Sequence, residues 1–209
     1  MRLYYPARFL SHVWLALFTR REVYGWENIP GKGPLLVVSN HVTAIDPPVI
    51  AVSLNRKLAF MAKAELFRSR LNAFLLNGMG TFPVHQGKLD TKALRSANRL
   101  LSQGLALAIF PEGRSSHNGH LQPALPGSAL IAARNGVTIL PVGISGTEQI
   151  RRRVWMFHRP RVIVKIGRPF HLPPTGNRLN KTDLADRANL IMSHIAALLP
   201  QEYLVDYSP

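Results

Sequence analysis

An α/β fold with a mainly parallel central sheet flanked by helices is predicted from three features of the sequence. Short apolar runs, such as residues 35–39 and 105–110, alternate with helical stretches such as residues 90–103. Runs that are apolar throughout are typical of strands buried on both faces, as in parallel sheets. The 209 residues are 46% hydrophobic and only 18% charged, which suffices for one sizeable core.

The predicted strands share β-branched or continuous apolar sequence between turn signals. They are residues 35–39, 58–62, 81–85, 105–110, 138–144 and 161–166. Proline cannot donate to a strand ladder, so Pro83 favours a sheet edge or a bulge. For the same reason we expect Pro141 to shape a sheet edge.

The predicted helices are bounded by capping and breaking residues. One begins at Asp46-Pro47, with Asp46 as the N-cap and Pro47 at the first helical position. The amphipathic helix 90–103 ends at Gly104, and another stops at Asn135-Gly136. The remaining predicted helices are residues 69–77, 128–134 and 183–199.

An N-terminal amphipathic helical appendage is expected over residues 1–21, with a single α/β domain over residues 22–209. Residues 9–19 carry no charge, but eleven residues of helix span only about 16 Å against about 30 Å of hydrocarbon. No small-residue cleavage site follows them, so they do not resemble a signal peptide. Trp14 and Phe18, flanked by arginines, resemble an interfacial anchor, although a helix docked on the domain remains the alternative.

The net charge of +15 indicates what kind of partner the protein binds, but it does not indicate the fold. Residues 1–21 hold four arginines and no acid, and residues 149–182 hold nine basic residues and no acid. Nucleic acid, an anionic membrane surface, an acidic soluble substrate and plain solvated faces all remain open. Cysteine is absent, which excludes disulfides and thiolate metal sites.

A histidine and an aspartate follow the first predicted strand. His41 lies on the turn after Ser39, and Asp46 comes five positions later. An aspartate that accepts from one imidazole nitrogen fixes the tautomer and leaves the other nitrogen free to take a proton from a hydroxyl. The same spacing arises by chance in about one such sequence in five, so it is weak alone.

A second polar turn, Glu112-Gly113-Arg114, follows the apolar run 105–110. An arginine on a glycine-containing turn can grip a phosphate through two parallel hydrogen bonds. The glutamate could position Arg114 or accept from a glycerol hydroxyl. Sites in parallel sheets form beyond the carboxyl ends of the strands, where both turns are expected.

Several motifs in one order resemble the glycerolipid acyltransferase family, which includes 1-acyl-glycerol-3-phosphate acyltransferases. They are NHVTAIDP for the His-x4-Asp motif, the neighbouring FMAKAELF, GTFPVHQG, FPEGRSS and LPVGISG, between Asn40 and Gly146. The resemblance implies an acyl-CoA or acyl-carrier-protein donor and a lysophosphatidic acid acceptor, giving phosphatidic acid. It implies no cofactor, no metal and no covalent acyl-enzyme.

The resemblance also assigns roles to residues. His41 is expected to deprotonate the acceptor hydroxyl, with Asp46 orienting it. Glu112, Gly113 and Arg114 are expected to bind the glycerol phosphate. The expected location is peripheral or monotopic, on the cytoplasmic face of a membrane.

Two positions depart from the family. Gln86 stands where many members have an arginine, and Leu125 lies where many have a nearby lysine. Lys63 and Lys88 could compensate, and otherwise the acceptor is another lysolipid or a glycolipid. The oxyanion of the tetrahedral intermediate is expected to be stabilised by backbone amides near Gly113 or at the Pro47 helix start.

Three rival functions remain. Ser145 in GISGT comes close to a hydrolase nucleophile elbow, but the fifth residue is Thr rather than Gly. His117 and His120 could bind a metal, but no acidic third ligand is nearby. Residues 151–158 mix three arginines with Trp155 and Phe157, as nucleic-acid stacking surfaces do, yet the chain has no recognisable nucleic-acid module. We therefore expect membrane lipids rather than nucleic acid as the partner.

Overall fold

A central sheet organises the structure, a computed structural model that describes residues 1–85, 90–151, 158–174, 179–205 and 207. Within these residues the sheet has seven strands in the order β1-β7-β6-β2-β5-β3-β4. Neighbouring strands pair in parallel except β6 with β7. The strands are β1 (Arg20–Tyr24), β2 (Leu35–Ser39), β3 (Leu58–Lys63), β4 (Thr81–Val84), β5 (Ala106–Ile109), β6 (Thr138–Ser145) and β7 (Arg161–Ile166).

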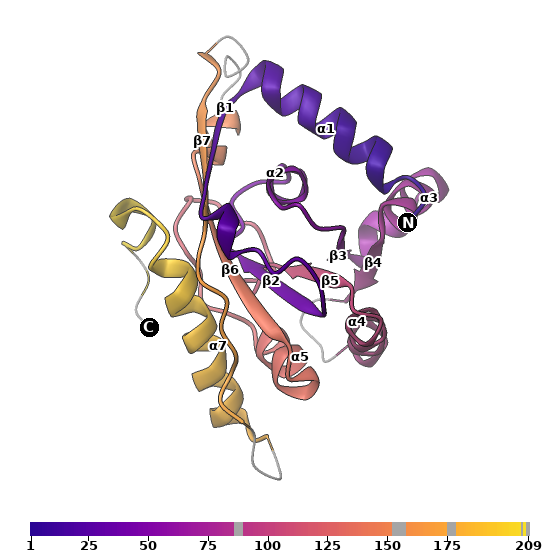
Figure 1. Cartoon of the computed structure of the whole chain (residues 1–209), viewed down its shortest axis with the longest axis vertical. Helices are drawn as coiled ribbons and strands as arrows, with labels where there is room; N and C mark the ends of the chain where they lie inside the picture. The colour runs from indigo at the N-terminus through magenta and orange to yellow at the C-terminus, as the bar shows by residue number, and fades with distance from the viewer. Residues whose placement is uncertain (86–89, 152–157, 175–178, 206, 208–209) are drawn as a thin grey trace.

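Helices cover both faces of this sheet and make a three-layer α/β fold, as the sequence predicted (Figure 1). The helices α1 (Tyr4–Phe18) and α2 (Asp46–Ser53) cover one face. The helices α4 (Thr91–Ser102), α5 (Gly127–Asn135) and α7 (Lys181–Ala196) cover the other. The helix α3 (Arg70–Met79) precedes β4, and the short 3-10 helices are η1 (Trp26–Asn28), η2 (Ala64–Phe67), η3 (Thr147–Arg151) and η4 (Gln201–Tyr203).

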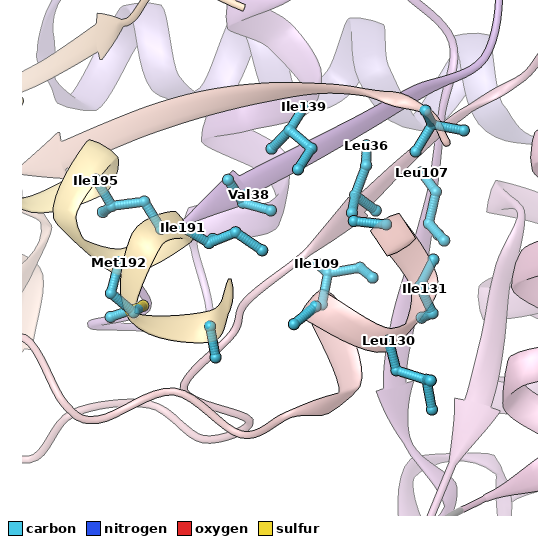
Figure 2. Packing of buried hydrophobic residues seen from close by; sticks show 14 of the residues in the cluster. Leu36, Val38, Leu107, Ile109, Leu130, Ile131, Ile139, Ile191, Met192 and Ile195 are labelled. Atoms are coloured by element: carbon cyan, nitrogen blue, oxygen red, sulfur yellow. The ribbon is translucent and has the colours of Figure 1, made fainter. Parts of the chain in front are cut away.

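The strand β2 shows why the buried runs are apolar throughout. Leu36 and Val38 face α5 and α7, as Figure 2 shows, whereas Leu35 and Val37 point to the layer of α1 and α2. All four side chains are fully buried. Burial of each contributes about 1.5–3 kcal/mol, so a polar residue on either face of β2 would be costly.

The N-terminal helix α1 packs on the domain and also presents apolar side chains to solvent. Tyr4 and Leu15 are buried, and the Tyr4 hydroxyl donates to the Arg56 carbonyl at 3.1 Å. More than half of each of the Tyr5, Phe9, Leu10 and Leu17 side chains remains exposed. No helix among the described residues is long and apolar enough to cross a membrane. Docking on the domain is therefore observed, and membrane contact remains a prediction.

The strand β1 was not predicted, because its sequence RREVY contains no apolar run. It pairs with β7, about 140 residues later in the chain, and the Arg161 Nε donates to the Glu22 carboxylate at 2.7 Å. The domain boundary expected after residue 21 falls inside this strand.

The two strand prolines behave differently. Pro83 lies in β4, the edge strand, as predicted. The edge position expected for Pro141 is wrong, because β6 is an interior strand between β7 and β2. The Pro141 carbonyl accepts from the Gly167 N–H at 2.9 Å, so the missing donor lies on the side of β7, before the ladder begins at Val142.

Candidate active site

Two loops meet at the carboxyl edge of the sheet because β2 and β5 are parallel neighbours. The first loop carries His41, and the second carries the turn Glu112-Gly113-Arg114. The His41 N–H donates to the Glu112 Oε1 at 2.7 Å, and the Ser116 N–H donates to the His41 carbonyl at 2.7 Å. The backbone of His41 is thus fixed from both sides by the second loop.

The His41 ring contacts Asp46 as the spacing predicted. The distance between the His41 Nδ1 and the Asp46 Oδ2 is 2.9 Å, and Asp46 is fully buried. The same oxygen accepts from the N–H groups of Val42 and Thr43 at 2.6 and 2.7 Å, and the Thr43 hydroxyl donates to Oδ1 at 3.2 Å. Because the other groups that contact this carboxylate are all donors, the contact favours the tautomer with the proton on Nδ1, which leaves Nε2 free to accept a hydrogen bond.

The N-cap role predicted for Asp46 is not observed. The helix α2 begins at Asp46 itself, with Ile45 as the N-cap residue, and no side-chain cap bond is made there. The carboxylate instead turns back to the loop, because its bonds to Val42, Thr43 and His41 take up both oxygens. Asp46 therefore orders the loop that carries His41 rather than the helix that follows it.

Phe110 and Asn40 also shape this site, although the residue pattern had not singled them out. The His41 and Phe110 rings stack with their centroids 4.1 Å apart. The Asn40 amide bridges to β6, donating to the Ile144 carbonyl and accepting from the Ile144 N–H, both at 2.8 Å. The sequence signal that could have predicted these two hydrogen bonds is an asparagine placed directly between a buried strand and a histidine.

Glu112 connects the two loops through hydrogen bonds and is not among the residues that line the cavity described below. Its carboxylate is buried and accepts from the N–H groups of His41 and Gln122, at 2.7 and 3.0 Å. Burial raises the pKa of Glu112, the two N–H donors lower it, the charge of Asp46 raises it and that of Arg114 lowers it, and the net pKa is about 8. Both oxygens are occupied, so this geometry favours a positioning role over contact with a glycerol hydroxyl.

Gly113 and Arg114 do face the cavity, and so does Lys63 at the end of β3. Gly113 has φ +69°, a left-handed conformation that favours glycine, and a Cβ atom there would push the Leu125 side chain aside. The Arg114 and Lys63 side chains are exposed. Gln86 and Lys88 lie outside the described residues.

A cavity of about 820 Å³ connects these residues. His41, Lys63 and Arg114 line it together with apolar residues of α3, β3 and α5, such as Leu76, Phe60 and Ile131. Its volume lies within the range of about 300–1,000 Å³ that is usual for ligand sites. A largely apolar wall with a few cations and one oriented imidazole suits a ligand with a long apolar part and an anionic part.

A second His–Asp pair lines the same cavity. The distance between the His85 Nδ1 and the Asp90 Oδ2 is 2.8 Å, and this pair also has the His-x4-Asp spacing. However, the His85 side chain is 65% exposed, against 18% for His41. Asp90 also caps α4 by accepting from the N–H groups of Lys92 and Ala93. Spacing alone therefore does not distinguish the two pairs.

The residues of the rival functions lie elsewhere. Ser145 is not among the residues that line the cavity. In the described ranges no group of three histidine or acidic side chains could hold a metal ion. Most of the basic and aromatic patch at residues 151–158 falls outside the described residues.

The fold and the loop geometry agree with one class of protein. The sequence model described as "Acyltransferase" matches residues 20–145, more than half of the chain, and the chain belongs to this family. Its similarity to solved structures includes the 1-acyl-sn-glycerophosphate (LPA) acyltransferase PlsC from Thermotoga maritima. That match has 26% identity and a TM-score of 0.73, and it covers 99% of this chain and 82% of the other.

Curated relatives carry the same description. The chloroplastic 1-acyl-sn-glycerol-3-phosphate acyltransferase BAT2 of Brassica napus is 28% identical over 149 residues, 68% of this chain and 43% of the relative. The 1-acyl-sn-glycerol-3-phosphate acyltransferase of Bacillus subtilis is 25% identical over 179 residues, 85% and 87% of the two chains. The chain spans about half the length of several of these relatives.

Proposed function

We propose that this protein transfers a fatty acyl group from acyl-CoA or an acyl-carrier protein to the free hydroxyl of 1-acylglycerol 3-phosphate, giving phosphatidic acid. One observation carries the proposal. The His41 Nδ1 lies 2.9 Å from a fully buried Asp46 carboxylate, and His41 lines an apolar cavity of about 820 Å³ that also contains Arg114.

The proposed reaction is a direct transfer without an acyl-enzyme. The Nε2 of His41 takes the proton of the acceptor hydroxyl while the hydroxyl oxygen attacks the thioester carbonyl carbon. The tetrahedral intermediate collapses, the C–S bond breaks, and the imidazolium returns its proton to the departing thiolate. Asp46 stabilises the imidazolium between the two steps.

The oxyanion of that intermediate requires hydrogen-bond donors. The start of α2 offers none, because the Asp46 N–H donates to the Thr43 carbonyl and the next two residues are prolines. The Gly113 N–H donates to the Phe110 carbonyl at 3.0 Å. The N–H groups of Arg114 and Ser115, which follow in the same cavity-lining turn, are the proposed donors.

The identity of the acceptor is proposed from the positively charged side chains that line the cavity. Arg114 and Lys63 can both pair with a phosphate, and a guanidinium can do so through two parallel hydrogen bonds. Leu125, at the place where many family members have a nearby lysine, is an apolar residue on the same wall. That departure favours a lysolipid or glycolipid without a phosphate monoester as the second candidate.

The test is a panel of acceptors offered to the purified protein with labelled acyl-CoA or acyl-carrier protein. The panel contains 1-acylglycerol 3-phosphate, lysophospholipids with other head groups, monoacylglycerol and glycerol 3-phosphate. Fastest transfer to 1-acylglycerol 3-phosphate supports the proposal, and preference for another lysolipid moves the function to the second candidate. Transfer to none of them would reject both.

A further inference from the structure

The helix α5 starts on the cavity wall without a cap. Its N-cap residue Pro126 has no side-chain acceptor, and the Leu130 N–H is the first to bond back, to the Pro126 carbonyl at 2.9 Å. The N–H groups of Gly127, Ser128 and Ala129 find no acceptor within the described part of the chain. Gly127 and Ser128 line the cavity. The positive end of the α5 dipole is thus directed at the cavity.

The Ser128 hydroxyl adds a second, independent observation. Its side chain is only 3% exposed, yet its Oγ has no hydrogen-bond partner among the described residues. A buried polar group without a partner is uncommon in folded proteins, because leaving it unpaired costs its full desolvation. Because Ser128 lines the cavity, rotation of its side chain toward a ligand there would pair this hydroxyl and remove that cost.

The start of α5 lies beside the Arg114 turn. The Leu125 N–H donates to the Pro111 carbonyl at 2.8 Å, and the Leu125 side chain fills the space beside Gly113. Arg114 therefore lines the same cavity as Gly127 and Ser128 at the start of α5. Together they form a set of donors and positive charge that matches phosphate oxygens.

We infer that the N-terminus of α5 and the Ser128 hydroxyl form an anion site that holds a phosphate group of a substrate next to Arg114. The inference deepens the proposed function and rests on it for the identity of the substrate. The helix terminus and the hydroxyl would supply the positive potential that a lysine near residue 125 supplies in many family members. The phosphate belongs either to the acceptor or to the donor.

Binding of inorganic phosphate to the full-length protein tests this site without turnover. Calorimetric titration is expected to show that Ser128→Ala weakens phosphate binding about tenfold, because a hydrogen bond to a charged group is lost. Ser128→Thr, which keeps a hydroxyl, is expected to retain most of the affinity. Ser193→Ala is the matched control, because Ser193 is exposed on α7 and bonds the Leu190 carbonyl.

Kinetic measurements then identify the source of the phosphate. If the acceptor supplies it, Ser128→Ala raises the KM ratio of 1-acylglycerol 3-phosphate to monoacylglycerol about tenfold. If acyl-CoA supplies it, the KM for acyl-CoA rises instead. Either result supports the site, and Ser128-dependent phosphate binding without acyl transfer would reject only the proposed function. Unchanged phosphate affinity in Ser128→Ala with a normal unfolding temperature would overturn the inference.

Discussion

His41 and His85 each contact an aspartate five positions later, and their surroundings decide what each pair can do. Asp46 is fully buried and accepts three hydrogen bonds from donors of its own loop. Asp90 instead caps α4 by accepting from the N–H groups of Lys92 and Ala93. The His41 ring is stacked on Phe110 and is mostly shielded from water. When an imidazole is already oriented by a carboxylate and shielded from water, its surroundings need to reorganise less as it accepts a proton. This favours His41 as the base.

Glu112 provides a prediction about pH. Its folded pKa of about 8 lies above the ordinary value of 4.5, so the folded protein keeps a proton that the unfolded chain loses between these two values. The contribution of Glu112 to the free energy of unfolding is fully present below about pH 4.5, and it is lost as the pH rises through about 8. We expect the free energy of unfolding to fall across this window and Glu112→Gln to abolish that part of the slope.

Denaturant unfolding at pH 5, 6.5 and 8 measures this slope, with Glu202→Gln as a control at an exposed position. A slope that is unchanged in Glu112→Gln would contradict the prediction. It would mean that the two N–H donors from His41 and Gln122 outweigh burial and keep the carboxylate ionised.

At the scale of elements, the site depends on how β2 is tied to its neighbours. The Asn40 amide takes up both the N–H and the carbonyl of Ile144, and all of these groups are buried. Asn40→Ala would leave both backbone groups unpaired, so we expect a loss of about 2–4 kcal/mol in the free energy of unfolding. A fall in kcat is expected as well, because His41 is the next residue.

The control for this variant is Asn189→Ala, an exposed asparagine on α7. Thermal unfolding and initial rates under saturating substrates measure the two effects. A stable Asn40→Ala protein with full kcat would show that β6 does not position the His41 loop.

The sequence predicted those elements whose signal is local. The apolar runs of β2, β5 and β6 and the capped helix α4 were found because burial on both faces and capping leave a direct mark on the sequence. β1 was missed, since its stability comes from pairing with a strand about 140 residues away. The prediction for Pro141 failed for the same reason, because strand order is a non-local property.

The candidate site divides in the same way. Contact of His41 with Asp46 followed from their spacing, and the position of both loops at the carboxyl edge followed from a parallel sheet. That the two loops meet depends on β2 and β5 being neighbours, which the sequence did not predict. The position of Glu112 away from the cavity could not be predicted, because a carboxylate on a loop can face either way until its backbone partners are known. The uncapped start of α5 was equally invisible, since it depends on the loop that precedes the helix.

At the scale of the whole molecule, charge and exposed apolar surface make a membrane the expected partner. The net charge is +15, and α1 exposes Phe9 and Leu10 while its Tyr4 and Leu15 belong to the core. Deleting α1 would therefore damage the fold, and point substitutions are the better test. Phe9→Ser with Leu10→Ser is expected to lower affinity for vesicles containing phosphatidylglycerol at least about tenfold.

Co-sedimentation with these vesicles measures the affinity, and Trp26→Ser serves as the control because Trp26 is equally exposed but lies outside α1. Binding is also expected to weaken as salt rises from low to high concentration, because the attraction is partly electrostatic. Equal sedimentation of the double variant and the wild type would contradict this role of α1.

The central claim is that the imidazole of His41 is the base, and a comparison of turnover in His41→Ala and wild-type protein tests it most directly. The rate of acyl transfer is expected to fall by about 10²–10⁴-fold while the unfolding temperature stays unchanged. His171→Ala, at an exposed histidine that bonds Thr138, is expected to keep full activity. Undiminished transfer by a purified, folded His41→Ala protein would contradict the claim.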